Sequence, residues 1–157
     1  MLAFDLKTSA QIKAFDPNVI SPLIAPNHQS MMDAAELSLH PTIPNVLYVS
    51  NRWVRHIAER EPHLTDVPGD SPLGDDVAII LLSPDGRAVE AIKHVQTGLD
   101  VIRGMRLSPD GRFAALVGQE GGGLEIFEIS GDRADAWRHV TSLREGMEGG
   151  LKHVVWL

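Results

Sequence analysis

The sequence contains no cysteine among its 157 residues. This absence excludes disulfide bridges and thiolate metal sites, and it is typical of proteins in a reducing compartment. No apolar run approaches the ~18 residues that a membrane-spanning helix needs. The first residues, MLAFDLKTSAQ, have neither a basic stretch nor a long apolar stretch, so they predict no secretory signal. We therefore expect a cytoplasmic protein that does not enter a membrane.

Positive charge is also scarce. The chain has 14 Lys and Arg against 21 Asp and Glu, which gives a formal net charge of -7. A phosphate backbone would be repelled by this charge, so we expect no nucleic-acid partner. Apolar residues make up 43% of the chain and charged residues 22%, a composition that supports a buried core and argues against disorder.

The chain does have a repeated turn motif. The string LSPDGR occurs at residues 82–87 and again at residues 107–112. Proline fixes φ, aspartate caps the local backbone and glycine accepts positive φ, so each copy predicts a turn that reverses a strand. Apolar stretches surround both copies, VAIILL and AVEAIKHV at the first, RGMRL and FAALV at the second. Each copy therefore predicts a β-hairpin.

A longer repeat of four strands emerges when the sequence is aligned strand by strand. Residues 35–52 (AELSLHPTIPNVLYVSNR) align with residues 104–119 (GMRLSPDGRFAALVGQ), and DDVAIILLSPDG aligns with GGLEIFEISGD. The two LSPDGR copies then occupy different places, one between the third and fourth strands of a unit and one between the first and second strands of the next. Repeats of four antiparallel strands predict β-propeller blades.

We therefore expect an all-β chain that forms a partial β-propeller of about two four-stranded antiparallel blades with flanking strands. Residues 1–33 are expected to hold the outer strands of a preceding blade and a linker loop, 34–98 and 99–145 one blade each, and 146–157 a closing strand. A single helical turn is expected after the first blade's second strand, where Trp53, Ile57 and Arg60 recur at helical spacing. Two blades cannot close a ring, so their open faces are expected to allow self-association.

Several motifs together resemble the C-terminal blades of the seven-bladed lactonase propellers, a family that includes bacterial 6-phosphogluconolactonase and the fungal carboxymuconate cyclases. The motifs are AAE, LYVSNR, IRGM, FAALVGQ, GGGLEIFEI and HVVWL, spread from about Ala34 to Leu157. The resemblance implies a lactone hydrolase or cycloisomerase that acts on a small anionic sugar lactone or muconate without a cofactor. Family members are more than twice as long, so the alternative is a non-catalytic fragment, scaffold or assembly subunit, inactive by itself.

Four polar residues are expected at one rim of the blades, where inner strands begin and second strands end: Glu36, Arg52, Arg103 and Gln119. Arg52 in SNR and Arg103 in IRGM match arginines that family members carry near the ligand. A guanidinium can hold a carboxylate or phosphate with two parallel hydrogen bonds. We therefore expect Arg52, Arg103 and Gln119 to contact the substrate, together with His28 in the loop before Glu36.

Glu36 interrupts an apolar strand, where a carboxylate must be paired or must face the channel. Together with Arg52 it is the expected catalytic pair, with Glu36 transferring protons. The structural alternatives remain open: Arg52 could simply pair with Glu36, and Arg103 could pair with Asp100 or Glu36. Gln119 could be a channel-lining residue alone.

The seven histidines predict no metal site. His56 and His63 flank a long loop, but their spacing matches no known ligand pattern, and neither HxxxH nor HxH occurs.

Overall fold

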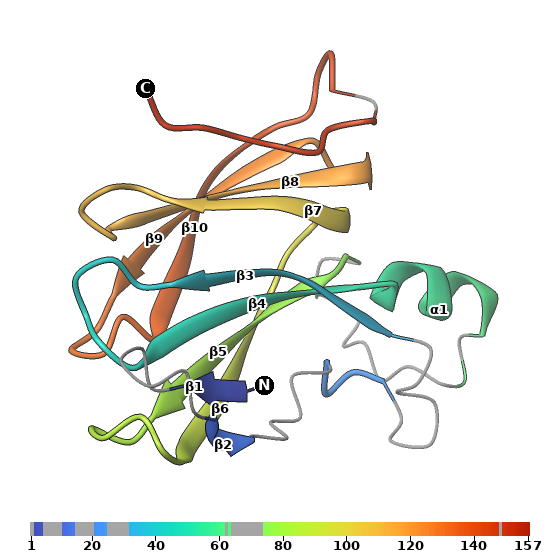
Figure 1. Ribbon diagram of the computed structural model, residues 1–157. Helices are drawn as coiled ribbons and strands as arrows, with labels where there is room; N and C mark the ends of the chain where they lie inside the picture. The colour runs from blue at the N-terminus through green and yellow to red at the C-terminus, as the bar shows by residue number, and fades with distance from the viewer. Residues whose placement is uncertain are drawn as a thin grey trace.

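The computed structural model describes residues 2–4, 11–14, 21–24, 32–61, 63, 74–147 and 149–157. Strands β3 (Asp33–Leu39), β4 (Val46–Arg52), β5 (Asp76–Leu82) and β6 (Val89–Gln96) form one four-stranded antiparallel sheet. Strands β7 (Asp100–Leu107), β8 (Phe113–Gly121), β9 (Leu124–Ser130) and β10 (Ala136–Leu143) form a second. The two sheets lie one above the other (Figure 1). The prediction of an all-β partial propeller is confirmed.

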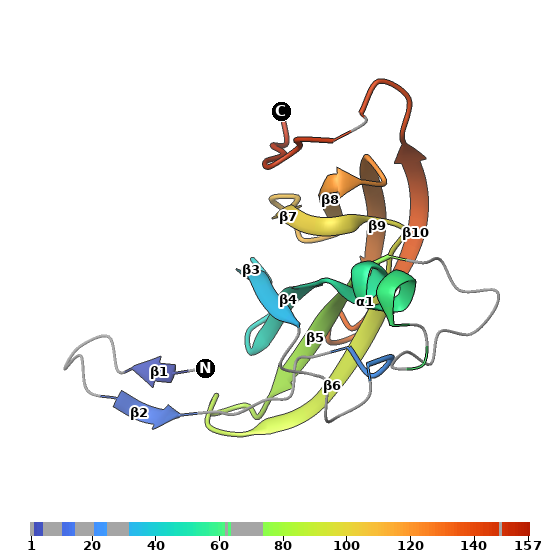
Figure 2. The same cartoon turned by 90° about the vertical axis from the view of Figure 1, so that its right-hand side faces the viewer.

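The strands of each sheet follow one another in sequence order. In Figure 2 each sheet runs from its first strand, β3 or β7, to its last, β6 or β10, toward the same side of the molecule. The short strands β1 (Leu2–Phe4) and β2 (Gln11–Ala14) pair separately as a hairpin. The expected helical turn is present as α1 (Val54–Arg60). No helix in the described ranges has the length and apolar character needed to cross a bilayer.

Both LSPDGR copies form the predicted turns, the first between β5 and β6 and the second between β7 and β8. In each copy the serine hydroxyl donates a hydrogen bond of 2.6 Å to the aspartate two residues later, Ser83 to Asp85 and Ser108 to Asp110. The glycines have φ angles of 69° and 75°, which glycine adopts at little cost. The local sequence therefore determines both turns in the same way.

The main core lies between the two sheets. Tyr48 on β4 is fully buried there; its hydroxyl donates a 2.8 Å hydrogen bond to the carbonyl oxygen of Ala134, and its ring contacts Trp137. Strand β5 is buried along its whole length, because alternate side chains enter this core and a second apolar cluster on the opposite face. Burial on both faces explains why its sequence, DVAIILL, shows little alternation of polar and apolar residues.

The expected closing strand is not formed: residues 149–157 contain no strand. The segment instead lies along β7, where Trp156 Nε1 donates a 3.1 Å hydrogen bond to the carbonyl oxygen of Arg106. The two backbones approach closely at Gly104, where a Cβ would lie 2.9 Å from the carbonyl oxygen of Lys152. The hydrogen bond to β7 comes from a side chain, whereas a strand requires a ladder of backbone hydrogen bonds to a partner strand.

Candidate functional site

Three of the predicted site residues meet at one end of the two sheets. Arg52 is the last residue of β4, Arg103 lies near the start of β7, and Glu36 lies on β3. Together with Ala34 and Ala35 they line a cavity of about 260 Å³, here called the arginine cavity. The LSPDGR turns lie at the opposite ends of these sheets, so they are remote from the cavity. The small alanine side chains leave room for a ligand between the charged groups.

Arg52 contributes hydrogen-bond donors that the protein does not satisfy. Its side chain is only 17% exposed, and its Nε makes no hydrogen bond. The nearest carboxylate oxygen is Oδ2 of Asp33, 3.9 Å from Nη2, at the limit of an ion pair. A buried donor without an acceptor costs free energy, so the surroundings of Arg52 are unfavourable to stability. The structural pairing of Arg52 with Glu36, considered from the sequence, is absent.

The ion pairs that the sequence offered for Arg103, with Asp100 or with Glu36, are also not formed. Glu36 Oε2 lies 3.5 Å from Nη1 of Arg106, and the Glu36 backbone N–H donates a 3.0 Å hydrogen bond to Ser50 Oγ. Arg103 is exposed and makes no ion pair with any residue that the structure describes. Its expected partners are engaged elsewhere, so its guanidinium faces the cavity without a fixed counter-ion.

The two remaining predicted contacts are Gln119 and His28. Gln119 lies on β8 and is not among the lining residues, although its buried Oε1 accepts no hydrogen bond. His28 falls outside the described residues. The roles of both as substrate contacts stay predictions.

A buried aspartate connects the two segments that carry the arginines. Asp75 is fully buried; its Oδ1 accepts a 2.8 Å hydrogen bond from the backbone N–H of Val54, and its Oδ2 accepts one of 2.8 Å from Val101. Trp53 and Val101 have positive φ angles of 86° and 54°, which are strained for such residues. Asp75 therefore holds two strained segments, each within two residues of an arginine. Burial raises the pKa of Asp75 to about 7.

A second polar cluster lies at the same end of the sheets. His56 Nε2, on α1, is 3.1 Å from Oδ1 of Asp100 and 3.2 Å from Oε2 of Glu120. Burial raises the pKa of Asp100, while His56 and Arg55 act in the opposite direction. The three residues are far apart in the sequence, and the fold brings them together.

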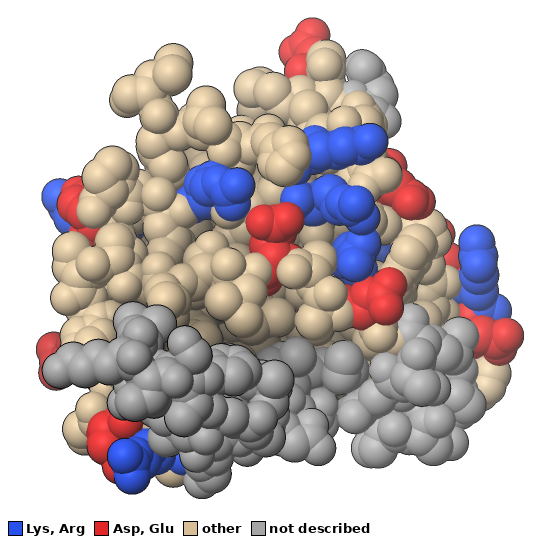
Figure 3. Space-filling model, viewed as in Figure 1, with Lys and Arg blue, Asp and Glu red and all other residues tan. Residues whose placement is uncertain are grey.

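Charged side chains gather on the face that β3 and β7 present in Figure 3, where basic groups lie beside acidic ones. These strands carry Glu36, Arg103 and Arg106. In the propeller arrangement the first strand of each blade lines the central channel. The arginine cavity therefore borders the strands that line the channel of a propeller.

Comparison with known families gives one match. Residues 3–146 match the family model described as Lactonase, 7-bladed beta-propeller. The chain belongs to the seven-bladed lactonase propeller family. A comparison with curated proteins finds no match. The match spans both described sheets, which are therefore two blades of a lactonase propeller.

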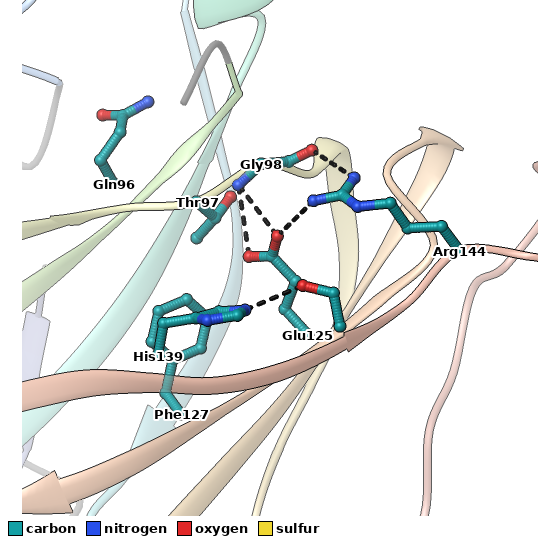
Figure 4. A pocket seen from close by; sticks show the side chains of 8 residues that line it. Gln96, Thr97, Gly98, Glu125, Phe127, His139 and Arg144 are labelled. Atoms are coloured by element: carbon teal, nitrogen blue, oxygen red, sulfur yellow. Dashed lines mark hydrogen bonds and ion pairs between the residues drawn. The ribbon is translucent and has the colours of Figure 1, made fainter. Parts of the chain in front are cut away.

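A further cavity of about 220 Å³ in this lactonase propeller is lined by groups that bind one another (Figure 4). Its buried carboxylate, Glu125, accepts hydrogen bonds from the Gly98 backbone N–H at 3.3 and 3.2 Å and from Arg144 Nη2 at 2.9 Å. Arg144 also donates toward the carbonyl oxygens of Gly98 and Gly122. These groups satisfy one another and hold the link between the blades, so this cavity is structural.

Sequence reasoning missed Asp75 and the cluster of His56, Asp100 and Glu120. For Asp75 a signal existed, because an acidic pair precedes an apolar strand in DDVAIILL, and a carboxylate beside a buried strand requires partners. The cluster gives no such signal. Its members come from a helix and two strands, and their sequence separations resemble no motif.

Proposed function

We propose that this chain binds a small organic anion, a lactone carrying a carboxylate or phosphate group or its open acid, in the arginine cavity. Arg52 and Arg103 anchor the anionic group, and Glu36 exchanges protons with the reacting oxygen or with water. The observation that carries the proposal is the lining of the arginine cavity: Arg52 lies no closer than 3.9 Å to Asp33 Oδ2, and Arg103 makes no ion pair with any described residue. Membership of the lactonase family supports the same class of ligand.

The test is a titration with 6-phosphogluconate and with a carboxymuconolactone. Arg52→Lys should weaken binding at least about 10-fold, because an ammonium group cannot form the paired hydrogen bonds of a guanidinium. Arg112→Lys is the matched control, since Arg112 stands beside Phe113 at the opposite end of the sheets and should bind as the unaltered chain does. Equal affinity in all three proteins, or binding in none, would contradict the site.

A second candidate is anion binding without turnover, as expected of a propeller fragment or scaffold. It is favoured by Glu36, the one carboxylate among the described residues that line the arginine cavity, because its side chain already contacts Arg106. A lactone-hydrolysis assay with Glu36→Gln separates the two candidates. An enzyme loses turnover and keeps binding, whereas a binding protein shows no turnover with either glutamate or glutamine.

A further inference from the structure

We propose that His56, Asp100 and Glu120 form a binding site for a divalent cation of the zinc or manganese type. The inference rests on the positions of three ligand atoms, one imidazole nitrogen and two carboxylate oxygens, which all lie within 4.8 Å of one another. It does not depend on the anion binding proposed for the arginine cavity.

The distances are those of atoms that share a cation. His56 Nε2 lies 3.1 Å from Asp100 Oδ1 and 3.2 Å from Glu120 Oε2. Metal–ligand bonds of about 2.0–2.2 Å place neighbouring ligand atoms about 3.0–3.5 Å apart in octahedral or tetrahedral geometry. His56 Nε2 is thus already at this separation from both carboxylate oxygens, and the two carboxylate oxygens lie within 4.8 Å of each other.

The hydrogen bonding of these atoms is the second observation. The Asp100 side chain is only 10% exposed, yet its Oδ1 accepts no hydrogen bond, and His56 Nε2 makes none either. Buried polar atoms normally have a bonding partner, and these two have none. A cation placed between them would bind both. Arg55 lies 3.9 Å from the other oxygen, Oδ2, so it leaves Oδ1 available.

The donor set indicates the class of cation. One imidazole and two carboxylates suit zinc, manganese or ferrous iron better than magnesium or calcium, which prefer oxygen ligands alone. Three protein ligands also leave coordination positions open, as in catalytic rather than structural sites. His56 borders a further cavity of about 330 Å³ with Trp53, Ile57 and Arg60, which gives space for water or another ligand.

The test is a calorimetric titration of the chelator-treated 157-residue chain with Zn²⁺ and Mn²⁺, with Co²⁺ absorption as a spectroscopic readout of coordination. We expect saturable binding of one ion per chain. Glu120→Gln should weaken it at least about 10-fold, while Glu59→Gln, which alters a neighbouring carboxylate outside the cluster, should leave it unchanged.

His56→Gln and His139→Gln provide a second matched pair, since His139 contacts Ser142 and lies outside the cluster. Only His56→Gln should abolish the Co²⁺ spectrum, and circular dichroism should show that both variants are folded. The proposal is overturned if the unaltered chain binds no ion, or if the cluster variants and the control variants bind equally. In that case the three groups form a charge cluster that does not bind a metal ion.

Discussion

Four aspartates lie in two pairs at opposite ends of the two sheets, and their environments differ. Asp85 and Asp110, in the LSPDGR turns, are exposed, and a serine hydroxyl and a backbone N–H lower the pKa of each. Asp75 and Asp100, at the end with the arginines, are buried, and this burial raises the pKa of each. The chemical group is the same, but desolvation dominates at the arginine end and local hydrogen bonds at the turn end.

This difference in environment distinguishes the turn end of the blades from the end that carries the arginines. At the turn end, Asp85 and Asp110 accept their hydrogen bonds from neighbours in the sequence. The other end holds the buried carboxylates of Asp75 and Asp100 and the buried Nε of Arg52, which makes no hydrogen bond. Such groups cost stability and concentrate at functional sites. Variants at the two ends should therefore differ in their effects.

The largest effect is expected from removing the Asp75 carboxylate. Asp75→Ala leaves the backbone N–H groups of Val54 and Val101 without acceptors in a buried site, which should lower the free energy of unfolding by about 2 to 6 kcal/mol. Urea denaturation followed by circular dichroism measures this. Asp85→Ala, the control at the turn end, should lower the free energy of unfolding by clearly less. Equal losses in the two variants would contradict the expected difference between the two ends.

The pH dependence of stability should also be controlled by Asp75. Its pKa is raised from 3.8 to about 7 on folding, so its contribution is complete below about pH 4 and is lost as the pH rises through 7. The free energy of unfolding should therefore fall over this interval, by up to about 4 kcal/mol from this group. Unfolding curves across the interval for the unaltered chain and Asp75→Asn give the difference. Asp85→Asn should keep the full slope; a slope unchanged by Asp75→Asn would show that the carboxyl ionises normally.

The smallest effect is expected from replacing the glycine of each LSPDGR turn by alanine. Gly86 and Gly111 both have positive φ, so alanine strains both. A Cβ on Gly111 would also overlap the ring of His40, whereas one on Gly86 would lie 3.5 Å from Asn45 Oδ1. Gly111→Ala should therefore destabilise more than Gly86→Ala by about 1 to 2 kcal/mol. Thermal unfolding of the two variants measures this difference in stability. Equal melting temperatures would mean that the ring of His40 moves aside without a loss of stability.

Much of the fold could be predicted because its signals are local. The LSPDGR turns, the apolar strands and the helical spacing at Trp53 act over a few residues, and each appears in the structure. The arginine cavity was also accessible to prediction, since strand order places the end of β4 beside the start of β7. The closing strand was not, because a strand depends on a partner that the segment HVVWL does not specify.

The sequence by itself determined the turns and the strand order, because turn geometry and the strand period are properties of short segments. These in turn determined the end of the blades at which Arg52, Arg103 and Glu36 meet. Only the tertiary structure decided which charges are paired. Glu36 contacts Arg106, and His56 lies beside Asp100 and Glu120. Asp75 accepts hydrogen bonds from two backbone segments. These contacts depend on distances of a few ångströms between residues remote in the chain, and on burial, which no single segment specifies.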